Sequence, residues 1–343
     1  HFKNNDGDLD IFPYPGRVAS YNQIIGAIEL VNTRVTPTSC MQSDTVARFY
    51  DTATMQCHRS EDSDTLSEFF FYHLKLDYLH EHLQNLSASL WVDQNTTSLD
   101  AHTLYYNAHL GAFTDCHLTF NFWSNGLVKI LINMETFLAE PYYEAPWMWM
   151  DILFVLILVR MFYSETRELI PAIRNGWDGL MNYVEFWNAV DWTSILLGTV
   201  VIAAWADICL SVSGPLQDAI AALPTAELDA LVYSNRTYLT PQQMESVMSR
   251  AEYEQRVGDL HALSSDIAGK HEDLRLLTFW YAFVLQMKFF KAFQANPRLD
   301  IVIRTLTMSA VEITHFIIVF LTIFMCFSCA GYVVWGKAIK GFK

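Results

Sequence analysis

Charge is scarce in this sequence, and basic charge is scarcer than acidic charge. Only 17% of its 343 residues are charged whereas 52% are hydrophobic, a balance too apolar for an ordinary soluble protein. The 22 Lys and Arg residues face 37 Asp and Glu residues, which gives a formal net charge of −15. Because contacts to phosphates require a basic surface, this balance excludes a nucleic-acid-binding protein.

Enzyme motifs and a disulfide framework are also missing. The sequence contains no G-x-S-x-G, no glycine-rich phosphate loop and no zinc-type spacing of Cys and His, so neither an enzyme nor a required cofactor is expected. Six cysteines are too few for a disulfide scaffold. Cys40 and Cys57 nevertheless lie in polar sequence, where a lumenal location would allow a bridge, with Cys116 as a competing partner.

Long apolar runs dominate the second half of the chain. The last two of them each have the roughly 20 residues that a helix needs to cross about 30 Å of hydrocarbon. The runs lie at residues 148–163, 192–210, 274–293 and 310–335. They predict an all-α bundle of four membrane spans.

Residues 1–146 have the mixed pattern of an α+β globular domain. Residues 66–90 carry apolar side chains at helical spacing, and residues 101–138 are rich in strand-forming Tyr, Phe, Thr and Ile. Asn125-Gly126 predicts a hairpin turn. The chain begins in polar sequence at His1, without an initiator Met or a signal peptide, so we expect the natural N-terminus to lie upstream.

Charge and sequons together predict the topology. Acidic residues gather in residues 1–150 and 207–273, whereas basic residues follow the first and third spans, which marks the cytosolic side. Three N-x-S/T sequons fall in the acidic segments, and they begin at Asn85, Asn95 and Asn235. N-linked glycans are predicted at these positions. The alternative is that all three are unmodified surface residues. The loop at residues 211–273 is long enough to have its own structure and to pack on the N-terminal domain.

Five short segments, in this order, resemble motifs of the polycystin family of transient receptor potential channels. They are residues 90–93 (LWVD), 106–108 (YNA), 186–191 (FWNAVD), 287–293 (MKFFKAF) and 332–336 (YVVWG). The resemblance implies that residues 1–146 form an exoplasmic polycystin domain with a Cys40–Cys57 disulfide. It also implies that the transmembrane part is built from voltage-sensor-like helices and a pore-domain helix.

On this resemblance the four spans correspond to the second to fifth helices of a six-helix channel. Residues 147–293 would hold the second to fourth helices, with the long exoplasmic loop 211–273 inside them. Residues 294–309 would be the linker to the fifth helix at 310–336. The first helix, the pore helices, the selectivity filter and the sixth helix have no counterpart in the sequence.

The function implied by this resemblance is that of a subunit in a tetrameric, non-selective, Ca²⁺-permeable cation channel. Its partners would be identical or other polycystin subunits, the lipid bilayer and an extracellular protein bound to the outer domain. Its location would be the ciliary or plasma membrane, with the endoplasmic reticulum as an alternative. Two other hypotheses stay open: a polycystin-1-like receptor or adhesion subunit, and a tether for extracellular filaments, each without its own pore.

Ionisable residues within the apolar spans are the candidate functional residues. Lys288 and Lys291 are three residues apart and therefore lie on one helical face. The resemblance implies that they sense voltage in gating. Alternatively, they anchor the helix at the cytosolic interface. Asn188 and Asp191, joined by Glu165, offer oxygen ligands for Ca²⁺. Alternatively, Asp191 neutralises one of the lysines or caps its helix.

Overall fold

The computed structural model describes residues 16–18, 21–39, 56–123, 126–142, 145–293 and 297–335. The chain divides into two compact units, each made of two segments. Unit 1 comprises residues 1–154 and 202–276, and unit 2 comprises residues 155–201 and 277–343. Cys40 and the side chain of Cys57 lie outside the described residues, and the predicted disulfide therefore does too.

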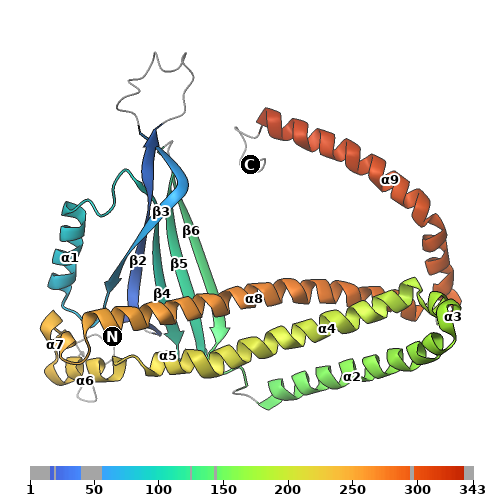
Figure 1. Ribbon diagram of the computed structural model, residues 1–343, viewed down its shortest axis with the longest axis horizontal. Helices are drawn as coiled ribbons and strands as arrows, with labels where there is room; N and C mark the ends of the chain where they lie inside the picture. Colours follow the sequence, from blue (N-terminus) through green and yellow to red (C-terminus); the bar gives the residue numbers. More distant parts are fainter. Residues whose placement is uncertain are drawn as a thin grey trace, which may run out of the picture. The chain divides into compact units, whose positions relative to one another are not determined.

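Unit 1 is built on an antiparallel β-sheet (Figure 1). Its strands run in the order β1-β2-β4-β5-β6, and β3 also pairs with β2. They are β1 (Arg17–Val18), β2 (Asn22–Ser39), β3 (Gln56–Phe70), β4 (Thr96–Asn107), β5 (Ala112–Phe122) and β6 (Val128–Leu138). The mixed sheet-and-helix character expected of the N-terminal part is confirmed.

Two consecutive hairpins set the register of the sheet. Strands β4 and β5 stay in one register from Ser98↔Asn121 to Asn107↔Ala112, and Gly111 has a positive φ in the turn between them. Strands β5 and β6 form the hairpin predicted near Asn125-Gly126, with the Gly126 amide bonded to the Trp123 carbonyl oxygen. Local turn chemistry therefore fixes which side chains face each other on β4, β5 and β6.

The predicted helix at residues 66–90 is wrong over its first part. Strand β3 continues to Phe70, where Phe69 and Phe70 pair with Glu29 and Ile28 of β2. Helix α1 begins only at Leu76 and ends at Ala88. Aromatic residues at helical spacing were recruited into the sheet because β2 offers a long edge with which to pair.

The segment expected to be a long structured loop, residues 211–273, is helical and packs on the sheet. It contains the π-helix η1 (Val212–Leu216), α5 (Gln217–Ala221), α6 (Thr225–Asn235), α7 (Pro241–Glu245) and the first half of α8 (Arg250–Phe293). Their apolar side chains, with those of the strands, form one core. Its most buried members are Ala27, Phe71, Leu104, Phe113, Phe137, Ile208, Val212, Leu216, Leu228, Val232, Tyr253, Val257, Leu260 and Ile267.

Helix α8 crosses the strands, as Figure 1 shows. Along the helix, His261 contacts Glu29 of β2, Ser264 contacts Asp115 of β5, and Arg275 contacts Glu135 of β6. The approach is close at Gly26 of β2, where an added Cβ would lie 3.1 Å from Val257. These contacts tie the helical segment to three strands.

Unit 2 is helical. It holds most of α2 (Ala145–Arg174) and α4 (Phe186–Ser211), the second half of α8, and the whole of α3 (Gly176–Tyr183) and α9 (Pro297–Trp335). Helices α2 and α4 come so close that a Cβ on Gly198 would lie 2.6 Å from Leu158, and Tyr281 of α8 is 3.2 Å away. Residues 297–309, expected as a linker, are helical and continuous with α9.

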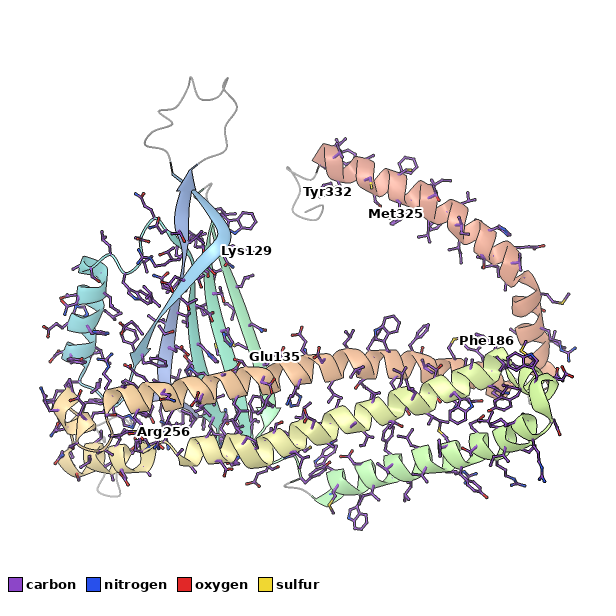
Figure 2. The ribbon with its side chains drawn as sticks, viewed as in Figure 1. Lys129, Glu135, Phe186, Arg256, Met325 and Tyr332 are labelled. Atoms are coloured by element: carbon purple, nitrogen blue, oxygen red, sulfur yellow. The ribbon has the colours of Figure 1, made fainter. Side chains whose placement is uncertain are left out.

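Three helices of the described part are long and apolar enough to cross a membrane: Pro146–Arg174, Phe186–Ala221 and Met308–Trp335. The predicted span at residues 274–293 is not among them, which corrects the expected four to three. That stretch is helical, but Lys288, Lys291 and Gln286 lower its hydropathy. The apolar side chains of the last span are exposed, and Figure 2 shows Met325 and Tyr332 projecting from α9.

Candidate functional site

A buried carboxylate in α4 pairs with both lysines of α8, inside unit 2. Asp191 is 3% exposed, and its Oδ1 lies 3.0 Å from the Lys288 ammonium. Its Oδ2 accepts a hydrogen bond from Lys291. Spacing of three residues on α8 places both ammonium groups on one helical face, which lets a single carboxylate bind both.

Hydroxyl groups of α4 complete the surroundings of Asp191. The fully buried Ser194 accepts a hydrogen bond of 2.9 Å from Lys288 and donates its own proton to the Asp191 carbonyl oxygen at 2.7 Å. A buried charge is costly unless it is paired and hydrogen-bonded, and here every charge at the centre of the cluster is paired. The sequence analysis missed Ser194. Its position three residues after Asp191 on an apolar helix could have indicated that both side chains lie on one helical face.

Glu165 of α2 lies near this cluster, whereas Asn188 is engaged elsewhere. Glu165 interacts electrostatically with Asp191 and Lys291, and within the described part of the chain its Oε2 is buried without a hydrogen-bond partner. The side-chain amide of Asn188 donates to the Tyr183 carbonyl oxygen at 2.6 Å. The structure therefore gathers Glu165, Asp191 and the two lysines.

The charges in this cluster bear on the predicted Ca²⁺ pocket. Asp191 is already paired with two ammonium groups, and Glu165 and Glu168 act electrostatically on the same site. A divalent cation on Asp191 would have to displace both lysines. The Ca²⁺ pocket stays a prediction, and the arrangement seen here is the alternative one, in which Asp191 neutralises lysine.

The three sequons lie in unit 1. Asn85 is exposed on α1, Asn235 is exposed at the end of α6, and Asn95 is partly buried just before β4. Glycosylation at each of them stays a prediction. Cys116, the competing disulfide candidate, is a free thiol on β5.

Residues 228–343 match the family model described as a polycystin cation channel. A curated relative, polycystin-2 of Caenorhabditis elegans, is 24% identical over 261 residues, which are 76% of this chain and 31% of that protein. Both matches support membership of the polycystin family. It spans about a third of the length of this curated relative.

These matches confirm the resemblance seen in the sequence. The matched family is one of cation channels and not of enzymes, in agreement with the expectation that this chain is no enzyme. The matched region contains the whole of α8 and α9, and with them Lys288 and Lys291. Their partner Asp191 and the nearby Glu165 lie before it.

A second polar cluster, in unit 1, escaped the sequence analysis. It brings together Glu29, His102, Asp115, His117 and His261. A hairpin with its turn near Gly111 pairs His102 with His117, so their proximity could have been derived from the sequence. His261 joins them from α8, and no local pattern indicates that contact.

Proposed function

We propose that this chain is part of a subunit of a polycystin-type cation channel. The observation that carries the proposal is the match of residues 228–343 to the polycystin cation channel family, because that region holds α8 and α9. In the proposed six-helix layout α2, α4, the second half of α8 and α9 are the second to fifth helices. Residues 1–146 correspond to the exoplasmic domain of that family.

The pairing of α4 with α8 gives this proposal a gating element. Moving one elementary charge across 100 mV of membrane potential is worth about 2.3 kcal/mol, so Lys288 and Lys291 are able to sense a field that acts along α8. Asp191 stabilises the one position of the lysines that the structure describes. In our proposal a shift of α8 breaks these pairs and reaches α9 through residues 294–309.

The finer properties of the channel belong to the same proposal. Four subunits, identical or mixed with other polycystins, would surround a non-selective, Ca²⁺-permeable pore. Asn85 and Asn235 are exposed, which supports glycosylation of an exoplasmic face. The proposed location is the ciliary or plasma membrane.

Electrophysiology on the full-length coding sequence tests the proposal. We expect a cation current whose voltage dependence shifts when Lys288 or Lys291 is replaced by Gln. The matched control is Lys270→Gln, since Lys270 is also ion-paired and lies on the same helix, but in unit 1, where it bonds Asp207 and Asp266. The control variant should leave the voltage dependence unchanged.

Two results would contradict this function in different ways. A protein that reaches the cell surface but carries no current would favour the receptor or filament-tether hypothesis. A cation current with equal voltage dependence in all three variants would keep the channel and assign the two lysines to anchoring. Surface biotinylation of each variant separates loss of current from loss of protein.

A further inference from the structure

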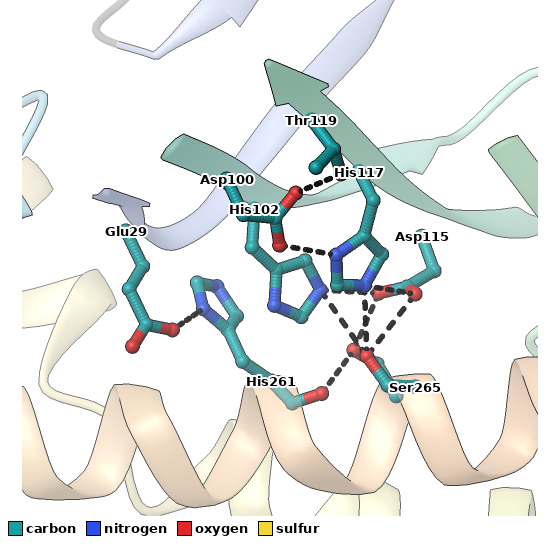
Figure 3. Close-up of polar contacts among 9 residues, drawn as sticks. Glu29, Asp100, His102, Asp115, His117, Thr119, His261 and Ser265 are labelled. Carbon is teal, nitrogen blue, oxygen red and sulfur yellow. Dashed lines mark hydrogen bonds and ion pairs between the residues drawn. The ribbon is translucent and has the colours of Figure 1, made fainter. Parts of the chain in front are cut away.

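Three histidines and three carboxylates meet between the sheet and α8, within unit 1 (Figure 3). Glu29 comes from β2, Asp100 and His102 from β4, Asp115 and His117 from β5, and His261 from α8. Neither the polycystin match nor the proposed gating element accounts for this cluster. Its centre is buried, with His102 at 5% and Asp115 at 2% exposure.

His117 is held by its Nδ1 so that its Nε2 points at Asp115. Its Nδ1 lies 2.9 Å from Asp100 Oδ2, and the other oxygen of Asp100 accepts a hydrogen bond of 2.6 Å from Thr119. His117 Nε2 is 3.2 Å from Asp115 Oδ2. A carboxylate on one ring nitrogen is the device by which proteins orient a histidine whose other nitrogen binds a metal ion.

His102 approaches the same carboxylate from the neighbouring strand. Its Nε2 is 2.7 Å from Asp115 Oδ1, and its ring stacks on that of His117 with centroids 3.8 Å apart. Helix α8 fixes Asp115 from the opposite side, since Ser264 donates to Oδ1 at 2.7 Å and Ser265 to Oδ2 at 3.3 Å. Two imidazole nitrogens and one carboxylate therefore converge at a single place.

We propose that His102 Nε2, His117 Nε2 and the Asp115 carboxylate bind a divalent transition-metal ion of the zinc type. Two histidines and one carboxylate are an established ligand set for Zn²⁺, with a fourth position left to water. Ser265, whose hydroxyl is 3.0 Å from His117 Nε2, lies beside that fourth position. Zinc–ligand bonds of about 2.0–2.2 Å require these side chains to part by less than about 1 Å.

Hydrogen bonds set the ionisation of the cluster as the structure describes it. Those to Asp100 and Asp115 raise the pKa of His117 to about 9. Burial alone would raise the pKa of Asp115, but hydrogen bonds from His102 and His117 lower it. A metal ion must therefore compete with a proton on His117.

Access to the site exists on one side. The side chains of His117 and Asp100 are each 27% exposed, whereas His102 and Asp115 are almost fully enclosed. An ion can therefore reach the ligands past His117 without unfolding of the sheet. The ordered shell behind the ligands and the open side at His117 are both features of sites that exchange their metal with solvent.

His102 also belongs to a neighbouring triad with Glu29 and His261, whose ligand atoms lie within 4.8 Å of one another. Nε2 of His261 is buried and, within the residues that the structure describes, has no hydrogen-bond partner. We assign the ion to the set that includes Asp115. Only that set has Asp100 and two serines to orient its ligands.

Direct metal binding by the purified, chelator-treated full-length protein in detergent tests this proposal. Titration with Co²⁺, followed by its visible absorption, and with Zn²⁺, against a chromophoric chelator, should each give one tight site per chain. His117→Ala should abolish it, and Asp100→Asn, which removes the carboxylate charge beside His117 Nδ1, should weaken it by about 10- to 100-fold. His80→Ala is the matched control, because His80 is exposed on α1.

The possible results distinguish a specific metal site from the absence of one. Zinc X-ray absorption with two imidazole ligands in the wild type, lost in His117→Ala but kept in His80→Ala, supports the site. Equal binding by wild type and Asp100→Asn, or no stoichiometric binding by folded wild type, overturns it. If His117→Ala fails to fold by circular dichroism, Asp100→Asn alone decides, since that change retains a hydrogen-bond acceptor for His117.

Discussion

Unit 1 has a core of fully buried apolar side chains between its sheet and its helices, whereas unit 2 exposes most of its large apolar side chains. Val257 and Leu260 in the first half of α8 are fully buried against the sheet, while Met308 and Phe327 on α9 are 83% and 75% exposed. Such exposure would be costly in water but is neutral in a bilayer, where lipid tails are as apolar as leucine. The contrast is the one expected when one part of a chain folds in water and another in a bilayer.

The two units also differ in how they arrange their buried polar groups. Unit 1 distributes buried polar contacts over several strands and a helix, around Asp115. Unit 2 concentrates its buried charge on Asp191 and two lysines. Because apolar burial gives little association energy between helices in lipid, this one cluster should contribute more to the stability of unit 2 than any single polar group does in unit 1.

The largest expected effect breaks that cluster. Asp191→Asn removes the charge that Lys288 and Lys291 share, and breaking a buried pair costs about 3–5 kcal/mol. Hydrogen-exchange mass spectrometry in detergent should show faster exchange in α4 and in the second half of α8. Asp207→Asn is the control, because Asp207 pairs with Lys270 in a largely exposed position and should cost at most about 1 kcal/mol.

Equal effects of these two substitutions would contradict the comparison. They would mean that solvent screens the ion pairs of Asp191 to the same extent as it screens an ion pair on the surface. The double variant Asp191→Asn, Lys288→Met sharpens the test, since removing both charges should cost less than the sum of the two single changes.

A smaller effect is expected from cutting the core of unit 1. Leu260→Ala deletes a fully buried side chain and should lower the free energy of unfolding by about 2–5 kcal/mol, measured by denaturant titration in detergent. Leu321→Ala on α9, where the side chain is 49% exposed, should change it by about 0.5 kcal/mol or less. A large loss at Leu321 would instead reveal that α9 packs against protein, as it would in an assembled channel.

The sequence predicted the membrane helices better than it predicted the sheet. Long apolar runs place α2, α4 and α9 without reference to other parts of the chain. Strand β3 was mistaken for helix over residues 66–70 because its partner β2 lies far away in sequence, and pairing overrides local spacing. Hairpins are the exception, since their turns fix the register locally.

The two polar clusters also differ in how far the sequence could predict them. Asp191 with Lys288 or Lys291 was one of two alternatives that charge alone allowed, and the pairing seen in the structure depends on the packing of α4 on α8. The meeting of His261 with His102 depends on where α8 crosses the sheet. That crossing is set by the shape of the whole core, including the glycine that admits the helix.

The smallest expected effect concerns that glycine. Gly26→Ala must adopt a positive φ and must also push its Cβ against Val257, which is buried and stiff at χ1. We expect the free energy of unfolding to fall by about 2–3 kcal/mol, of which roughly 1–2 kcal/mol is the cost of the left-handed backbone.

Gly111→Ala is the matched control, because Gly111 also has a positive φ but an added Cβ meets nothing within 4 Å. The difference between the two variants therefore measures the approach of α8 to the sheet, and Val257→Ala should reduce the penalty at Gly26 but not at Gly111. If the two glycines respond equally to substitution, the sheet and α8 are not in tight contact at Gly26, and unit 1 is packed more loosely than its buried core indicates.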